Sequence, residues 1–137
     1  MTMQKQKVKL TTLNQPAQFE IKAEVNYIDA ESNPDSSYFF FAYKIKITNR
    51  GNAPAQLMSR HWVITDGTGH VEEVRGAGVV GAQPKIMPGQ SFEYESACPL
   101  TTSSGSMRGC YQMLNQEGQT FDAEIPEFFL IAPSALH

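Results

Sequence analysis

The sequence predicts an all-β protein in which seven or eight short strands form a sandwich or a barrel. Three observations support this prediction. Apolar and polar residues alternate along several segments, which is the period-two pattern of a strand with one wet face. Turn signals rich in Gly, Pro, Asn and Asp separate these segments at fairly regular intervals. Nowhere does an apolar spacing of three and four persist long enough to predict a helix of ordinary length.

The first half of the chain contains the clearest strand patterns. Residues 1–17 are polar and are expected to be a loose lead-in to a single domain over residues 18–137. Alternation over residues 19–27 predicts a strand, and turn-forming residues at 29–37 are expected to follow it. Residues 38–49 form the most apolar segment, whose aromatic and β-branched content favours a central strand.

The only tryptophan lies in the next alternating run, which follows Pro54. Two sets of residues would face opposite sides of that strand. One contains Gln56, Met58, Arg60, Trp62 and Ile64, and the other contains Ala55, Leu57, Ser59, His61 and Val63. The pattern alone leaves the inner face open, although Trp62 and Ile64 favour theirs.

The second half of the chain combines strands with one long connection. The Asp-Gly-Thr-Gly sequence at residues 66–69 supplies the positive-φ positions of a hairpin. Residues 76–85 show no periodicity, and a connection of about ten residues without structure of its own is often functional. Pro126 is expected to stop or bend the last strand. The remaining strands are expected at residues 70–75, 92–98, 106–114 and 120–125, with an edge segment at 128–131.

Length and composition bound the class of protein. At 137 residues, of which 41% are hydrophobic, the chain suits one packed domain. Its net charge of −3 gives no electrostatic reason to expect nucleic acid or an anionic membrane as the main partner. The amino terminus lacks a secretory signal and no stretch approaches the ~18 apolar residues of a membrane span, so we expect a cytoplasmic protein. Cys98 and Cys110 are expected to be ordinary buried, reduced thiols.

The sharpest motif is Gly-Ala-Gly-Val-Val-Gly at residues 76–81, which matches the Gly-x-Gly-x-x-Gly pattern of dinucleotide-binding folds. In those folds a helix follows the glycines, and its amino terminus holds the pyrophosphate. No helical pattern follows here, so a Rossmann site is not expected. Two interpretations remain: an anion-binding nest of backbone amides assisted by Arg75 or Lys85, or a loop whose glycines meet only steric needs.

Val79 and Val80 lie at the centre of this loop. Their side chains either plug back into the sandwich or stand exposed, and the sequence leaves both alternatives open. If they are exposed, they form an apolar tip for a protein partner.

Histidines and carboxylates offer little for metal binding. His61 and His70 flank the predicted hairpin with Asp66 at its turn, but two imidazoles and one distant carboxylate are few for a zinc site. Glu72 and Glu73 leave a strand on opposite faces and cannot share a metal. No nucleophile motif is present either, so we expect no enzyme activity, no metal and no cofactor.

Segments spread along the chain carry a family resemblance. They lie at residues 62–66, 73–74, 76–81, 83–84, 88–89, 92–94 and 105–113. With these motifs the sequence resembles the ApaG family over nearly its whole length. The resemblance implies an immunoglobulin-like, fibronectin type III-like β-sandwich. It also implies an association with Co2+ resistance and Mg2+ efflux, and similar domains in eukaryotes serve as protein-interaction modules.

Together the loop and the resemblance predict a non-enzymatic binding protein that presents residues 75–85 to a protein partner. The expected site consists of Arg75, Gly76, Gly78, Val79, Val80, Gly81 and Lys85. The alternative is a binder of pyrophosphate or a dinucleoside polyphosphate on the backbone amides of Gly76 to Gly81, and a hydrolase of such nucleotides is a third. Exposed sheet edges also leave a homodimer open.

Overall fold

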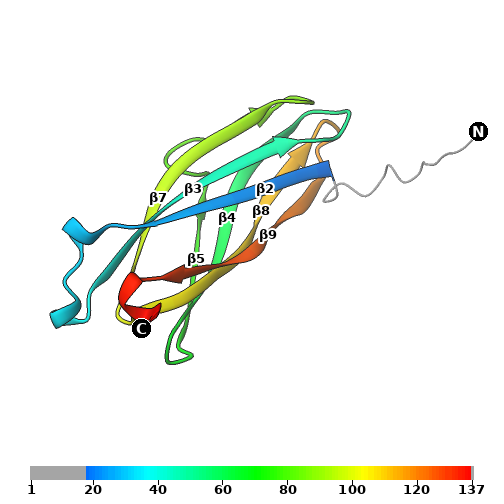
Figure 1. The fold of residues 1–137 in the computed structure, drawn as a ribbon. Coiled ribbons are helices and arrows are strands. Elements are labelled where there is room, and N and C mark those ends of the chain that lie inside the picture. Colours follow the sequence, from blue (N-terminus) through cyan, green and yellow to red (C-terminus); the bar gives the residue numbers. More distant parts are fainter. Residues whose placement is uncertain (1–17, 137) are drawn as a thin grey trace, which may run out of the picture.

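Two antiparallel β-sheets pack face to face in the computed structural model, which describes residues 18–136 (Figure 1). A three-stranded sheet has the order β2-β3-β7, and a five-stranded sheet has the order β5-β4-β8-β9, with β6 paired to β4. The first sheet comprises β2 (Phe19–Tyr27), β3 (Phe39–Asn49) and β7 (Ser91–Leu100). The second comprises β4 (Ala55–Asp66), β5 (Val71–Ala77), β6 (Lys85–Ile86), β8 (Ser104–Asn115) and β9 (Thr120–Ile131).

This architecture confirms the all-β prediction and identifies the sandwich as the correct alternative. From Phe19 to Leu136 the helices are three short 3-10 turns at Asp29–Glu31, Pro34–Ser36 and Pro133–Leu136. The first two occupy the segment whose residues predicted turns. None of the helices described is long and apolar enough to cross a membrane. The predicted lead-in at residues 1–17 lies outside the described residues.

The hydrophobic core lies between the two sheets, and the sequence of β3 shows why. Phe41, Ile45 and Ile47 are fully buried, whereas the alternating Lys44 and Lys46 are exposed. β3 is also the central strand of its sheet, as its composition predicted. The alternation therefore places one apolar face of this strand in the core.

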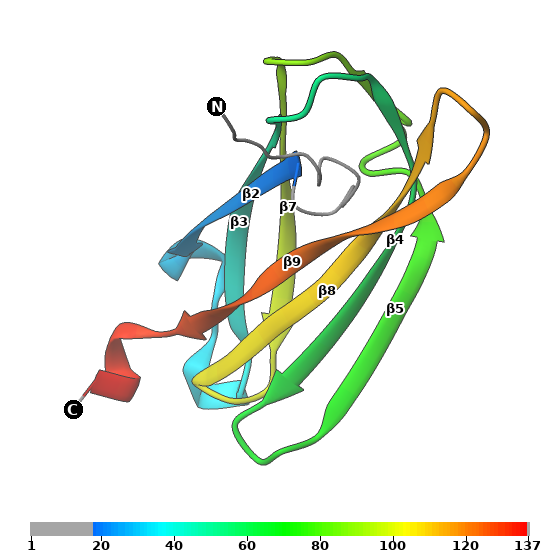
Figure 2. The ribbon, with the colours of Figure 1, turned by 90° about the vertical axis from the view of Figure 1, so that its right-hand side faces the viewer.

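An aromatic cluster around Trp62 joins the two sheets. The Trp62 ring centroid lies 5.6 Å from that of Tyr43, 6.3 Å from that of Tyr111 and 5.9 Å from that of Phe128, each time edge to face. Pairs of rings in this arrangement stabilise a core beyond the area that they bury. Figure 2 shows the sheets facing each other, with β9 crossing in front of β7.

A β-bulge in β4 overturns the single alternation that was predicted for this strand. Leu57 and Ser59 pair with adjacent residues of β8, so Met58 is an extra residue on β4. An extra residue shifts the two faces of a strand by one position. Leu57 therefore belongs to the same buried core as Trp62, although strict alternation assigned them to opposite faces.

Pro126 bends β9 and does not end it. Met107 and Gly109, two residues apart on β8, lie opposite Phe128 and Ile125, which are three residues apart on β9. The extra residue on β9 forms a second bulge, which accommodates a proline that cannot donate to the ladder. Beyond it the strand continues as the edge of its sheet, as predicted.

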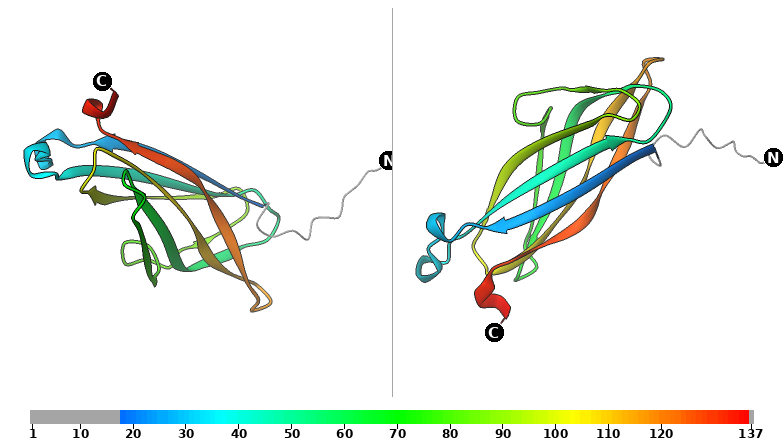
Figure 3. Two further views of the ribbon diagram at one scale, coloured as in Figure 1. Left: turned by 90° about the horizontal axis from the view of Figure 1, so that it is seen from below. Right: turned by 45° about the horizontal axis from the view of Figure 1, so that its top comes forward.

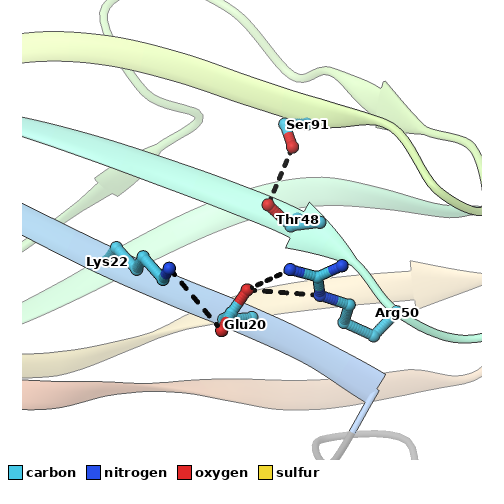
Figure 4. Close-up of polar contacts among 5 residues, drawn as sticks. All are labelled: Glu20, Lys22, Thr48, Arg50 and Ser91. Carbon is cyan, nitrogen blue, oxygen red and sulfur yellow. Dashed lines mark hydrogen bonds and ion pairs between the residues drawn. The ribbon is translucent and has the colours of Figure 1, made fainter.

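Polar contacts near one end of the three-stranded sheet join all its strands (Figure 4). The hydroxyl oxygens of Thr48 and Ser91 lie 2.7 Å apart and join β3 to β7. Arg50 directly follows β3, and its guanidinium donates a hydrogen bond of 2.6 Å to Glu20 on the neighbouring strand β2. This bond holds the pKa of Glu20 below its ordinary value, with a smaller contribution from Lys22. Because the pair is exposed to solvent, it contributes little to stability.

Candidate functional site

The Gly-rich loop is shorter than the sequence suggested, because strands extend into it from both ends. Gly76 and Ala77 are the last residues of β5, and β6 begins at Lys85. The prediction that residues 76–85 lack structure was therefore wrong at both ends. The loop proper comprises residues 78–84.

The tip of the loop is a two-residue turn closed by two backbone hydrogen bonds. The Val79 N–H donates to the Ala82 carbonyl and the Ala82 N–H donates to the Val79 carbonyl, each at 2.9 Å. The two central residues, Val80 and Gly81, have φ angles of 42° and 82°. Positive φ at both central positions is the mark of a type I′ turn.

Val80 is an unusual residue at the first central position of this turn. Type I′ turns favour Asn, Asp or Gly there, whereas a β-branched side chain at positive φ is a steric outlier. A conformation of this kind costs on the order of 1–3 kcal/mol, and such conformations cluster at binding and switch regions. The tip therefore carries local backbone strain.

The two valines of the loop lie in opposite environments. Val79 is 1% exposed and belongs to the core, whereas Val80 is 61% exposed. The sequence left burial and exposure open for this pair, and each valine adopts one of them. Val79 thus anchors the turn, while Val80 presents its isopropyl group to solvent.

Gly78 and Gly81 are required for different steric reasons. Gly78 has a φ of 64°, and a Cβ atom there would lie 2.3 Å from the Ala82 carbonyl oxygen. A Cβ atom on Gly81 would meet nothing within 4 Å, so only its φ of 82° favours glycine. Steric needs therefore account for both glycines.

Three N–H groups of the loop are engaged internally. Gly78 donates to the Met58 carbonyl at 2.9 Å, and two further N–H groups close the turn. The N–H groups of Val80 and Gly81 have no hydrogen-bond partner in the described part of the chain. These two donors at the tip are free to meet a ligand or a partner.

Arg60 on β4, which the sequence did not single out as a site residue, supports the base of the loop. Its Nη1 donates to the carbonyl oxygens of Ala77 and Gly78, each at 3.0 Å. Its guanidinium also lies against Gly76, where a Cβ atom would come within 2.9 Å of Cζ. The sequence feature that could have identified Arg60 is its position on the same strand face as Trp62. A charged side chain on an inward face requires polar partners.

Two glutamine side chains fasten the return of the loop to β4. Gln83 Nε2 donates to the Met58 carbonyl at 2.9 Å, and Gln56 Nε2 donates to the Gln83 carbonyl at 3.0 Å. Both sides of the loop are thus bonded to the same strand. The turn at the tip projects from a well-supported base.

The two cations of the predicted site lie on strands and not in the loop proper. Arg75 Nη2 lies 3.3 Å from Glu73 Oε1, and Arg75 lines a hollow of about 340 Å³ together with His61 and Asp122. Lys85 is exposed on β6 and forms no ion pair within residues 18–136. Both predicted cations therefore flank the loop, one on each of the strands that it connects.

The histidines of the β4–β5 hairpin have separate partners. His61 Nε2 lies 2.7 Å from Glu73 Oε1, and this contact holds the pKa of Glu73 below its ordinary value. At the turn, Asp66 accepts hydrogen bonds from the Thr68 hydroxyl and from the N–H groups of Thr68 and His70, which lower the pKa of Asp66. Among residues 18–136, no three His, Cys, Asp or Glu side chains are grouped so that they could hold a metal ion.

Buried phenols and a buried thiol lie between the sheets. The hydroxyl groups of Tyr94 and Tyr111 form a hydrogen bond in the core, and burial raises the pKa of both phenols. Burial also raises the pKa of the Cys98 thiol to about 11, with a smaller contribution from Glu72. Such a thiol stays protonated at neutral pH and is a poor nucleophile. Cys98 is therefore the ordinary buried thiol that the sequence predicted. Cys110, which was also expected to be buried, is only half-buried.

Comparisons with known proteins agree with this fold. The family model described as the ApaG domain matches residues 29–115. The chain is 66% identical over 119 residues to Protein ApaG of Bdellovibrio bacteriovorus, covering 87% of this chain and 94% of that protein. It is 52% identical over 120 residues to Protein ApaG of Chromobacterium violaceum, covering 88% and 95%. The crystal structure of a Bordetella pertussis protein described as ApaA matches with a TM-score of 0.82 at 47% identity, covering 84% of this chain and 94% of that one.

Proposed function

The chain belongs to the ApaG domain family, and from this premise we propose that it is a non-enzymatic binding protein whose loop tip docks onto a protein partner. The observation that carries the proposal is Val80, which is 61% exposed and held at a φ of 42°. An exposed apolar side chain alone is ordinary on a protein surface. Val80, however, is held in a strained backbone conformation by the hydrogen bonds at the base of the loop. Strained conformations of this kind cluster at binding sites, so the strain at Val80 supports a role in binding.

The tip offers a small apolar knob flanked by hydrogen-bond donors. The Val80 side chain supplies apolar area, and the free N–H groups of Val80 and Gly81 supply directed donors. A partner with an apolar pocket beside a carbonyl or carboxylate oxygen matches both features. Because the base of the loop is already ordered by Arg60 and Gln83, little conformational entropy is lost on binding.

The resemblance implies an association with cobalt resistance and magnesium efflux. In this proposal the protein influences both by binding its protein partner in the cytoplasm, and not by binding the metal ions itself. The grouping of side chains supports this route, because residues 18–136 contain no cluster of three potential metal ligands. The two free cysteines suit a reducing compartment.

The second candidate function is binding of pyrophosphate or a dinucleoside polyphosphate. The two unpaired N–H groups of Val80 and Gly81 favour it, because adjacent backbone donors can form an anion-binding nest. Titration with pyrophosphate, followed by the NMR shifts of these two amides, tests it. If neither amide moves at millimolar ligand, this candidate is eliminated.

A photo-crosslinking amino acid at position 80 tests the protein-docking proposal in cells. The matched control carries the same amino acid at position 71, where Val71 on β5 is 51% exposed. We expect one cross-linked protein that is specific to position 80, identified by mass spectrometry. Equal cross-linking from both positions, or none from position 80, contradicts the proposal.

A further inference from the structure

The sandwich is closed along one side and open along the other. β2 packs against β9 on the closed side (Figure 3). The ring centroids of Phe19 on β2 and Phe121 on β9 lie 6.1 Å apart. On the open side, a cavity of about 300 Å³ lies between the sheets and is lined from both edge strands, β5 and β7. Its size falls at the lower end of the range of small-molecule sites, ~300–1,000 Å³.

Three cross-strand pairs of residues on β4 and β5 form three successive rows along one wall of this cavity. The pairing of β4 with β5 places Arg60 opposite Gly76, Trp62 opposite Val74, and Ile64 opposite Glu72. The middle row is apolar, and Met107 and Tyr43 also line the cavity. Each of the two outer rows carries one charge. The cavity thus has a cationic end, an apolar middle and an anionic end.

Arg60 supplies the cationic end. Its Nη1 is engaged by two loop carbonyls, but Nε and Nη2 form no hydrogen bond with the rest of residues 18–136. A guanidinium with free N–H groups is suited to receive a carboxylate, and Arg is the usual residue for that purpose.

Glu72 supplies the anionic end. It forms no hydrogen bond or ion pair within the described residues, and it is near enough to Cys98 to contribute to the raised pKa of that thiol. Glu72 and Gly76 are four residues apart on β5, which separates their Cα atoms by about 13 Å at ~3.3 Å per residue. Because the Arg60 guanidinium lies against Gly76, the two charges occupy opposite ends of the cavity.

We propose that this cavity binds a small, elongated zwitterion, with its carboxylate on Arg60, its ammonium group on Glu72 and its apolar chain over Trp62. A ligand with one charge leaves the opposite end without a partner, at a cost in desolvation. An α-amino acid carries both charges on one carbon and is too short to reach both ends. An ω-amino acid, with its charges at the two ends of a methylene chain, matches the arrangement.

Trp62 is the only tryptophan of the chain and lines the cavity, so its fluorescence reports on binding there. The probes are γ-aminobutyrate, ε-aminocaproate and ω-aminooctanoate, with hexanoate and hexylamine as singly charged controls. We expect saturable changes, with higher affinity for the two longer ω-amino acids. Either singly charged control should bind about tenfold more weakly than ε-aminocaproate, a difference of ~1.4 kcal/mol. If no ω-amino acid gives a saturable change at millimolar concentration, the proposal is overturned.

Glu72→Gln tests the ammonium site with little risk to folding, because Glu72 is exposed and has no partner within residues 18–136. In this variant hexanoate and ε-aminocaproate should bind with equal affinity, and an unchanged preference for ε-aminocaproate overturns the assignment. The control Glu73→Gln lies on the opposite face of β5 and should leave every affinity unchanged. Val80→Asn should also leave them unchanged, so this proposal and the docking proposal fail separately.

Discussion

Arg60 donates a hydrogen bond of 3.0 Å from its Nη1 to the carbonyl oxygen of Gly78. Gly78 is the residue at which the chain leaves β5 and enters the loop, with a φ of 64°. The same arginine lines the cavity between the sheets. One side chain therefore supports the proposed docking loop and also forms the cationic end of the proposed zwitterion site.

Replacing Arg60 by Met keeps most of the apolar stem and removes the guanidinium. The carbonyl oxygens of Ala77 and Gly78 then lose a charged donor, so the free energy of unfolding should fall by about 1.5 kcal/mol. Hydrogen exchange at the Gly78 amide should become faster. Denaturant titration and NMR measure the two effects. The control Arg75→Met breaks only an exposed pair with Glu73 and should change neither; equal losses in both variants contradict the role of Arg60.

Replacing each of the two loop glycines by alanine should distinguish the cost of backbone strain from the cost of a steric collision. Gly81→Ala forces positive φ on a residue with a Cβ atom but meets no neighbour, so we expect a loss of about 1 kcal/mol. Gly78→Ala adds a collision with the Ala82 carbonyl oxygen and should be clearly more destabilising. Thermal unfolding of the two variants gives the ranking, and the reverse order contradicts the loop geometry described here.

The strands could be predicted from the sequence, but the direction of some side chains could not. Alternation in β3 follows directly from its composition, because one face is buried and the other is wet. The bulge at Met58 has no compositional signal, so counting by twos assigned Leu57 to the wrong face. Bulges arise from the pairing of two strands, and that pairing is fixed only in the folded chain.

The glycines of the candidate site could be predicted from the sequence, but the side chains that hold the base of the loop could not. The glycines of the loop indicate tight turning wherever they occur. The strand face that Arg60 shares with Trp62 marks it as a charge that needs partners, but which partners it meets depends on the register that brings it opposite Gly76, and no local pattern reveals that register. Val79 and Val80 are chemically identical, so only the geometry of the turn decides which of them is buried.

Burial of Cys98 predicts a loss of stability at alkaline pH. The pKa of this thiol rises from its ordinary value of 9.0 to about 11 in the folded protein. Its stabilising contribution is complete below the unfolded-state pKa and is lost as the pH rises through about 11. Over that window the slope approaches ~1.4 kcal/mol per pH unit for one proton.

The Cys98→Ala variant isolates this effect. The buried phenols of Tyr94 and Tyr111 also have raised pKa values and destabilise the fold in the same direction at higher pH, but both remain in the variant. The free energy of unfolding should therefore decline less steeply between pH 9.0 and about 11 in Cys98→Ala than in the parent. Parallel curves for the two proteins show that the thiol does not titrate as described.

The hydrogen bond between Tyr94 and Tyr111 should appear as coupling in a double-mutant cycle. Tyr111→Phe leaves the Tyr94 hydroxyl buried without its partner, which should cost about 1–3 kcal/mol. Adding Tyr94→Phe removes the orphaned hydroxyl, so the double variant should be more stable than the sum of the single losses predicts. Strict additivity in denaturant titrations is the result that excludes this interaction.

Val80→Asn tests the central claim most directly, because Asn is favoured at this position of a type I′ turn. The variant should raise the free energy of unfolding by about 1 kcal/mol by relieving the strain. It should also abolish binding of the protein that cross-links to position 80, whereas Val71→Asn should leave that binding unchanged. A Val80→Asn protein that gains no stability, or that binds this partner with the parental affinity, contradicts the account.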